Sequence, residues 1–175
     1  MENVPECKTN QERAKLPPHN KIALPMKVIV REFMEADREV LRDLFVASRD
    51  ASFPWAPPGA HKLEDFDMCT EGERILVALA SSNPVGFASI WEADSFLHNL
   101  FVHPLFLTLG VGRALLAHCE KYFSSVPTLK CVKLNDRARR FYESQGWRER
   151  VEADGPEGPY LLMERAGPSI SMRLP

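Results

Sequence analysis

The sequence predicts one domain with an α+β fold, or a mixed-sheet α/β layer fold, in which strands and helices mix without strict alternation. A length of 175 residues lies in the usual range of a single domain and suffices to bury a core without a disulfide or metal. Hydrophobic residues make up 45% and charged residues 26%, which excludes a wholly disordered chain, a collagen-like fibre and a disulfide scaffold. Strand-like runs follow one another as well as helical segments, which argues against a Rossmann domain.

The two ends of the chain are expected to lie outside the folded domain. Residues 1–25 contain four of the 14 prolines, many Lys, Asn and Gln residues, and little hydrophobic periodicity, a composition that predicts a disordered tail. They also lack the apolar stretch of a secretory signal. The expected organisation is therefore a tail over 1–25, a single domain over 26–166 and a short tail over 167–175.

The first part of the domain is predicted as strand, helix, loop and helix. Residues 28–30 form a β-branched run, typical of a strand. A helix begins at 35–37, and the proline-rich segment 52–59 ends it, because proline lacks a backbone donor and disfavours a helical conformation in the preceding residue. A second, less regular helix is expected at 62–69. The apolar positions of the first helix follow a spacing of three and four: Val40, Leu41, Leu44, Phe45 and Ala47.

Three strand-like runs follow, at 75–80, 85–91 and 96–102, and residues 81–84 are typical of a hairpin loop between the first two. The glycine-bearing segment 110–112 then leads into a helix. Its expected apolar face comprises Val111, Leu115, Cys119 and Tyr122, with Leu116 and Phe123 beside it. The remaining elements expected are a strand at 129–133, a helix at 136–145, and strands near 147–151 and 160–163.

Charge and cysteine content exclude several classes of function. The chain has 22 Lys+Arg and 24 Asp+Glu residues, a net charge of -2, and so lacks the overall basic field that drives nucleic-acid binding. Its four cysteines, Cys7, Cys69, Cys119 and Cys131, form no CxxC pair, so we expect reduced cytoplasmic thiols, with Cys119 and Cys131 buried, and no metal site. The most apolar long stretch, residues 96–112, is interrupted by two histidines, a proline and Asn99, so no membrane span is expected.

The clearest chemical signal is the segment Val102-His-Pro-Leu-Phe-Leu-Thr-Leu-Gly-Val-Gly-Arg113, in which a strand leads through a loop into a helix start. A helix start offers unpaired N–H groups and a partial positive charge, and Gly110 and Gly112 let an anion approach the backbone. Arg113 in the first turn opposes the helix dipole, a conflict that a bound phosphate would remove. The alternative is a loop that only makes a tight helix–sheet contact. The segment matches neither the dinucleotide-binding fingerprint nor a P-loop.

Two segments together resemble the GNAT acetyltransferases. Leu107-Thr-Leu-Gly-Val-Gly112 matches the family's acetyl-CoA turn, Gln/Arg-x-x-Gly-x-Gly/Ala, at both glycines, although Leu107 stands where the pattern has Gln or Arg. Asn135-Asp-Arg-Ala-Arg-Arg-Phe-Tyr-Glu-Ser-Gln-Gly-Trp147 matches the family's closing motif, Asn-x-x-Ala-x-x-Phe-Tyr-x-x-x-Gly-Phe/Trp, in residue type and spacing. Alone, the second segment is also explained as a packed helix with Asn135 as its N-cap and Gly146 after its end.

The resemblance implies a mixed, mostly antiparallel sheet of about six or seven strands, flanked by helices on both faces, with a splayed strand pair at a cofactor cleft. It implies acetyl-CoA as cosubstrate and no metal. The main chain of Leu100, Phe101 and Val102 would bind the pantetheine arm and the thioester carbonyl, and Asn135 would hydrogen-bond that arm or order nearby water. The turn that would hold the diphosphate comprises Thr108, Leu109, Gly110, Val111, Gly112 and Arg113.

Acyl transfer from a thioester to an amine requires that the amine lose a proton and that the leaving thiolate gain one. The resemblance places Tyr142 near the cofactor sulfur, as the general acid. His98 is the expected general base, acting through water, because imidazole exchanges protons near neutral pH. Strand alternation places His98 on one face with Phe96, Leu100 and Val102. The alternative for His98 is a structural histidine at the sheet surface.

The same strand also resembles that of the arylalkylamine acetyltransferases at His98 and His103, although Phe96 stands where they have another histidine. Some relatives have a catalytic Glu at the position of Lys130, so that base is excluded here. On the acceptor side, residues 53–55 could form an apolar wall, with Asp50, Glu64 or Asp65 attracting a cationic amine. Alternatively, these residues form a solvated, proline-rich surface loop.

We therefore expect an N-acetyltransferase that transfers an acetyl group from acetyl-CoA to a primary amine, of a small molecule or a peptide, by direct attack in a ternary complex. One alternative is a non-catalytic acyl-CoA-binding or regulatory module with the same fold. Another is an interaction domain without a cofactor. We expect no nucleic-acid or membrane partner. The sequence leaves open whether the chain forms a homodimer and which amine it accepts.

Overall fold

The computed structural model describes residues 27–156 and 158–165. The expected tails over 1–25 and 167–175 lie outside the described residues. Within the described part of the chain, no helix is both long enough and apolar enough to cross a membrane.

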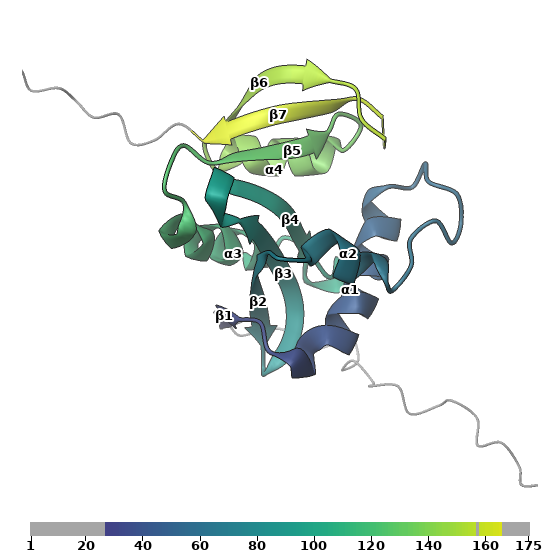
Figure 1. Cartoon of the computed structure of the whole chain (residues 1–175). Helices are drawn as coiled ribbons and strands as arrows, with labels where there is room; N and C mark the ends of the chain where they lie inside the picture. Colours follow the sequence, from purple (N-terminus) through teal and green to yellow (C-terminus); the bar gives the residue numbers. More distant parts are fainter. Residues whose placement is uncertain (1–26, 157, 166–175) are drawn as a thin grey trace, which may run out of the picture.

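The described residues form one seven-stranded sheet in the order β1-β2-β3-β4-β5-β7-β6 (Figure 1). Neighbouring strands pair antiparallel except for β4 and β5, which pair parallel. The sheet is thus mixed and mostly antiparallel, as the resemblance implies. The strands are β1 (Val28–Glu32), β2 (Arg74–Ala80), β3 (Asn83–Trp91), β4 (Phe96–Val102), β5 (Thr128–Val132), β6 (Trp147–Ala153) and β7 (Tyr160–Arg165).

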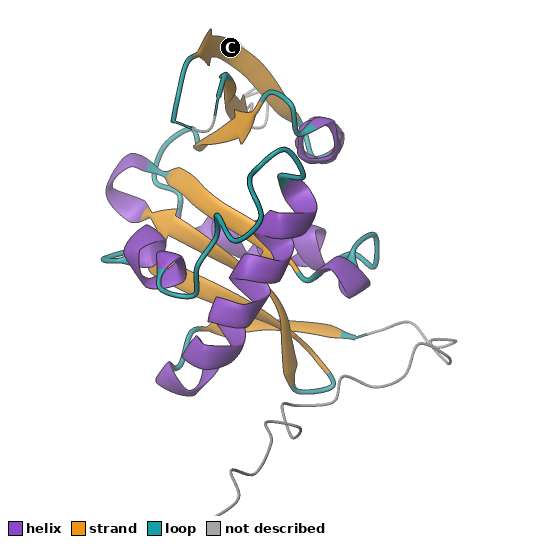
Figure 2. Cartoon of the chain, turned by 90° about the vertical axis from the view of Figure 1, so that its right-hand side faces the viewer, coloured by secondary structure: helices purple, strands orange, loops and turns teal. Residues whose placement is uncertain are grey.

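Helices cover both faces of this sheet. In Figure 1 α1 and α2 lie to the right of the central strands and α3 to the left, and Figure 2 views the molecule from the α1–α2 side. The α-helices are α1 (Arg38–Ser52), α2 (Asp65–Thr70), α3 (Val111–Cys119) and α4 (Asp136–Ser144). Short 3-10 turns occur at η1 (Glu35–Asp37), η2 (Glu92–Asp94), η3 (Pro104–Phe106) and η4 (Glu120–Tyr122).

The core on the α1–α2 face is largely aromatic. The buried positions of α1 follow the expected helical spacing and meet Phe66 of α2 and Phe87 of β3, whose rings lie edge to face at 5.3 Å between centroids. Such pairs contribute about 0.5–1.5 kcal/mol beyond their buried area. The cluster consists of Leu41, Leu44, Phe45, Phe66, Val77 and Phe87.

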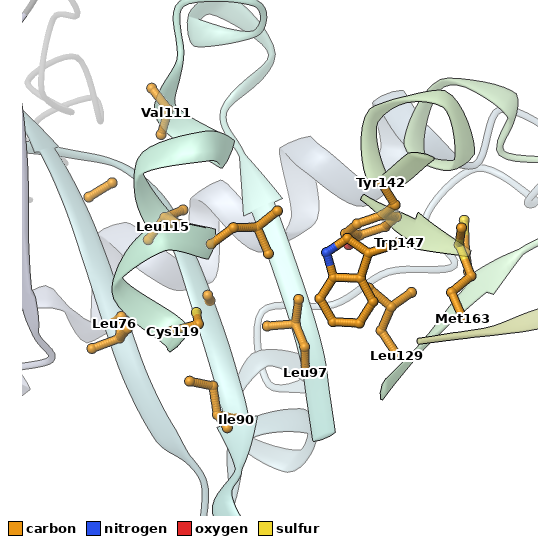
Figure 3. Close-up of a cluster of buried hydrophobic side chains, with 14 of the residues drawn as sticks. Leu76, Ile90, Leu97, Val111, Leu115, Cys119, Leu129, Tyr142, Trp147 and Met163 are labelled. Carbon is orange, nitrogen blue, oxygen red and sulfur yellow. The ribbon is translucent and has the colours of Figure 1, made fainter. Parts of the chain in front are cut away.

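The core on the α3–α4 face joins the two halves of the sheet. Figure 3 shows Val111, Leu115 and Cys119 of α3 directed towards the central strands, with Tyr142 and Trp147 beside Leu129 on the other side of β4. The expected burial of Cys119 and Cys131 is confirmed. The two thiols are apolar core members, and burial raises the pKa of Cys119 to about 12 and that of Cys131 to about 11.

The helix expected to reach Tyr122 ends earlier. α3 stops at Cys119, and the 3-10 turn η4 follows it. The hydroxyl oxygen of Ser95 accepts hydrogen bonds from the N–H groups of Ser124 and Ser125, both at 3.0 Å, and so draws the chain away towards β5. Tyr122 therefore lies in this 3-10 turn, where its ring still packs against the same core as α3 and its hydroxyl donates to Glu32 at 3.0 Å.

The feature that positions the functional site is the divergence of β4 from β5. The two strands pair only at Phe96 with Thr128 and at Leu97 with Leu129. Beyond these pairs each strand keeps its other neighbour, β3 for β4 and β7 for β5, while the two separate. The splayed strand pair that the resemblance implies is therefore present.

Candidate active site

The cleft at this divergence has a volume of about 840 Å³ and reaches both faces of the sheet. From the α3–α4 face it is lined by Gly110, Asn135 and Tyr142, and from the α1–α2 face by Arg49 and Cys69. Eleven of the twelve sequence-predicted site residues line it. They are His98, Leu100, Phe101, Val102, Thr108, Gly110, Val111, Gly112, Arg113, Asn135 and Tyr142. Leu109 is not part of this lining and is 39% exposed.

One wall of the cleft is the start of α3, and its backbone suits an anion. Thr108 (φ 65°) and Gly110 (φ 84°) both adopt the left-handed conformation, which is uncommon for threonine and turns the chain sharply into the helix. The first intrahelical hydrogen bond runs from the Ala114 N–H to the Gly110 carbonyl at 3.0 Å, so the three preceding N–H groups have no intrahelical partner. A Cβ on Gly110 would meet nothing within 4 Å, whereas one on Gly112 would stand 3.0 Å from Cζ of Phe141.

Cationic side chains flank this helix start. Arg113 on α3 and Arg137 and Arg140 on α4 line the cleft, and among the described residues none of the three forms an ion pair. Lys130 lines it from β5, with its ammonium group 4.9 Å from the centre of the Tyr160 ring. Arg137 and Arg140 are not among the sequence-predicted site residues, although both stand inside the closing motif. These cations and the helix start fit the phosphate groups of a coenzyme A molecule.

Asn135 has the capping role that its position before a helix suggests. Its side-chain oxygen accepts a hydrogen bond from the Ala138 N–H at 3.1 Å, and the residue also lines the cleft. The capping role leaves the functional one possible in chemical terms, because the cap uses the oxygen and the amide nitrogen is a separate donor.

Tyr142 is 8% exposed and packs between Phe141 and Trp147, with ring centroids 5.4 and 6.0 Å away. Burial, together with the nearby thiols of Cys131 and Cys119, raises the pKa of its phenol far above the ordinary value. The hydroxyl group therefore keeps its proton throughout the physiological range.

His98 is the extra residue of a β-bulge. Asn99 pairs with Ser89 and Leu97 with Ile90, which leaves His98 without a partner on β3. The expectation that His98 shares a face with Leu100 and Val102 is therefore wrong, because the bulge reverses the alternation. Leu100 and Val102 pack against the α3–α4 core, whereas His98 points to the opposite face.

On that face the imidazole of His98 meets a carboxylate. Its Nδ1 lies 2.5 Å from Oε1 of Glu73, whose side chain is only 5% exposed, while the imidazole is 46% exposed. A carboxylate is an acceptor, so this contact holds the proton on Nδ1 and leaves Nε2 as the acceptor. Glu73 is not among the sequence-predicted site residues, since only the fold brings residue 73 to residue 98.

Other sequence candidates lie elsewhere. His103 does not line the cleft, and its Nδ1 accepts the Leu105 N–H at 3.3 Å. Burial lowers the pKa of His103, which favours the neutral ring that such an acceptor requires. Of the candidate acceptor residues, Phe53 lines the cleft, while Asp50 pairs with Nδ1 of His61 at 2.8 Å on the surface.

No group of three or more His, Cys, Asp or Glu side chains is arranged to hold a metal ion within residues 27–156 and 158–165.

Comparison with known proteins matches the sequence to one family and the fold to many solved structures. The solution structure of YjaB from Escherichia coli, in its apo form, is 21% identical with a TM-score of 0.67, covering 82% of this chain and 100% of that one. The PaiA N-acetyltransferase from Thermoplasma acidophilum, in complex with coenzyme A, is 18% identical with a TM-score of 0.67, covering 80% and 99%. The ribosomal-protein-S18-alanine N-acetyltransferase from Escherichia coli is 20% identical with a TM-score of 0.57, covering 82% and 99%.

At these identities the likeness to solved structures shows the fold alone. A search of curated proteins finds no significant match. The model of the acetyltransferase (GNAT) family, in contrast, matches residues 38–147, which is more than half of the chain. The chain belongs to the acetyltransferase (GNAT) family.

Proposed function

We propose that this protein is an N-acetyltransferase that transfers the acetyl group of acetyl-CoA to a primary amine by direct attack in a ternary complex. The observation that carries the proposal is the cleft at the β4–β5 divergence, which reaches both faces of the sheet. A helix start with unpaired N–H groups stands on one face, and a histidine–carboxylate pair stands on the other. Two substrates can therefore enter from opposite sides and meet between the strands.

The chain offers a continuous set of groups for the nucleotide cosubstrate. Main-chain N–H groups over 108–113 and the guanidinium of Arg113 would hold the diphosphate. On the side where β5 has diverged, the main chain of Leu100, Phe101 and Val102 would pair with the pantetheine arm in the manner of an added strand. Asn135 would donate to the same arm. When bound, acetyl-CoA supplies the acetyl group as an activated thioester.

Two side chains would carry out the two proton transfers, from the amine and to the thiolate. Nε2 of His98 would accept a proton from the incoming ammonium through water, while Glu73 stabilises the positive charge that forms on the ring. The buried phenol of Tyr142 would hold the proton that a departing thiolate needs. No metal is assigned a role.

The decisive experiment measures cosubstrate binding and turnover separately. Saturating CoA should raise the melting temperature, and acetyl-CoA with a panel of primary amines should release free thiol. The His98→Ala variant should retain CoA binding and lose the acidic limb of the kcat/KM profile. His118→Ala is its matched control, because His118 is an exposed histidine on α3 that does not line the cleft.

The outcomes separate this proposal from its alternatives. Stabilisation by CoA without thiol release for any amine would favour a non-catalytic acyl-CoA-binding module. If CoA does not raise the melting temperature, the remaining alternative is an interaction domain without a cofactor. An acidic limb that survives in His98→Ala would remove His98 as the base.

A further inference from the structure

A second cavity, of about 410 Å³, adjoins the cleft on the α1–α2 face. Cys69 and His98 line both cavities, so the two lie side by side at these residues. We call it the acidic pocket, because Glu71, Glu73 and Asp94 line it.

Glu73 carries an unused acceptor in this pocket. Its side chain is 5% exposed, and its Oε1 is taken by His98. Its Oε2 is buried and has no hydrogen-bond partner among the described residues. A buried carboxylate oxygen without a donor is costly, so a ligand that brought a donor to this oxygen would be stabilised.

The charged side chains around this oxygen are mainly negative. Within the described residues, the pocket has three carboxylates in its lining and neither Lys nor Arg. Arg74, the next residue after Glu73, is bound elsewhere, since it pairs with Glu32 and Glu92, each at 2.6 Å. His98 is the one basic side chain of the lining, and it is already paired with Oε1.

The remaining walls also suit a cation. Trp91 and Phe96 line the pocket, and Trp91 is 44% exposed. The faces of aromatic rings attract ammonium groups, and their apolar surface accepts methylene chains. Carboxylates together with aromatic rings therefore suit a positively charged alkylamine.

We propose that the acidic pocket binds a second cationic group of the acceptor, so that the preferred substrate is an aliphatic diamine or polyamine. The inference rests on the proposed function, because the reacting amine must lie in the cleft while the distal ammonium lies beyond His98. The distal group donates to Oε2 of Glu73 and is held by Glu71 and Asp94.

The test compares diamines from 1,3-diaminopropane to 1,6-diaminohexane with monoamines of the same carbon number. At the best chain length, kcat/KM for the diamine should exceed that for the monoamine by at least about tenfold, the effect of one well-placed charged contact. The Glu71→Gln/Asp94→Asn double variant should abolish this preference and leave the monoamine rate unchanged. Both residues are exposed, so the variant retains the fold.

Glu92→Gln is the matched control, because Glu92 lies two residues from Asp94 but outside the pocket lining. It removes one negative charge from the same turn and should leave the preference intact. If monoamines are acetylated, the proposal is overturned when no diamine outperforms its monoamine, or when the preference survives in the double variant.

Calorimetric titration of the same diamines into the CoA-bound protein distinguishes this inference from the proposed function. Binding that the double variant loses would support the pocket even if no amine were acetylated, an outcome that would refute only the proposed function. Turnover of monoamines without any diamine binding would overturn the pocket alone.

Discussion

At the scale of single residues, the phenol of Tyr142 is held in an environment that favours its protonated form. It lies between two aromatic rings and beside two buried thiols, and burial raises its pKa. A raised pKa means that the proton is retained to a higher pH than an ordinary tyrosine allows. Tyr142 is therefore available as a proton donor wherever the enzyme works.

Tyr142→Phe removes only the hydroxyl group. We expect kcat to fall by about 10²-fold or more, the usual range for a general acid, and CoA affinity to change by less than about twofold. In the wild-type enzyme the phenol should cause no loss of rate as the pH rises to about 10, because its pKa lies above the ordinary value of ~10. Steady-state kinetics across pH, with calorimetry for CoA, measure both effects. A variant that turns over at the wild-type rate would contradict the role of Tyr142.

At the scale of elements, the start of α3 depends on a backbone conformation that glycine adopts readily. Gly110 has φ of 84°, and a Cβ there would clash with nothing. A substitution at Gly110 therefore changes stability and binding by straining the main-chain conformation, and not by a steric clash with neighbouring side chains.

Gly110→Ala should cost about 1 kcal/mol of stability and weaken CoA binding by about tenfold or more, because the N–H groups of the helix start would shift. Gly59→Ala is the matched control. Gly59 has φ of 73°, is equally open, and does not line the cleft. It should lose similar stability and bind CoA as the wild type does. Equal CoA affinity in both variants would argue against a phosphate site at α3.

Another element-scale contact joins β1 to the start of α1. Arg31 donates two hydrogen bonds to Asp37, at 2.7 and 2.8 Å, and the Met34 N–H donates a third at 2.8 Å. Hydrogen bonds from Arg31 lower the pKa of the buried Asp37 carboxyl below its ordinary value. The stabilisation is therefore complete above the unfolded value of ~3.9 and is lost as the pH falls through the folded value.

Asp37→Asn should lower the free energy of unfolding by about 1–3 kcal/mol at pH 7, and the difference from wild type should shrink as the pH falls below about 4. Urea denaturation at both pH values measures this. Asp43→Asn makes the same chemical change on the exposed face of α1 and should have an effect within about 0.5 kcal/mol. A loss that stays constant with pH would show that the charge is not its cause.

At the scale of the whole molecule, the sheet consists of two parts joined by little strand pairing. β1 to β4 form one part and β5 to β7 the other, and two residue pairs link them, supplemented by the α3–α4 core (Figures 1 and 3). A ligand that binds between β4 and β5 would therefore bridge the two parts.

Saturating CoA should slow amide hydrogen exchange in peptides covering 98–102, 110–113 and 130–132. Peptides of the β2–β3 hairpin around 78–84 lie away from the cleft and should be unchanged. Ligand-linked stabilisation reaches about 2.7 kcal/mol at a concentration of 100 times Kd, enough for a clear change in exchange. Protection confined to the hairpin would place the ligand elsewhere.

Much of this architecture is readable from local sequence. The helical spacing of Leu41, Leu44 and Phe45 identifies α1, and the two motifs identify the start of α3 and the whole of α4. These features involve residues close in sequence, so periodicity and capping preferences report them. The boundaries shift by a few residues where a distant group intervenes, as Ser95 does at the end of α3.

The sequence by itself determined the family resemblance and the glycine-bearing turn before α3, and it singled out Tyr142, Asn135 and His98 as candidate site residues. Only the tertiary structure decided which way His98 faces, since the bulge depends on how β4 pairs with β3. It also brought Glu73 to His98 across 25 positions and gathered Glu71, Glu73 and Asp94 around one pocket. The physical reason is that local periodicity determines on which face of a regular helix or strand a residue lies. A bulge, a strand divergence or a carboxylate cluster instead depends on how segments far apart in the sequence pair with one another.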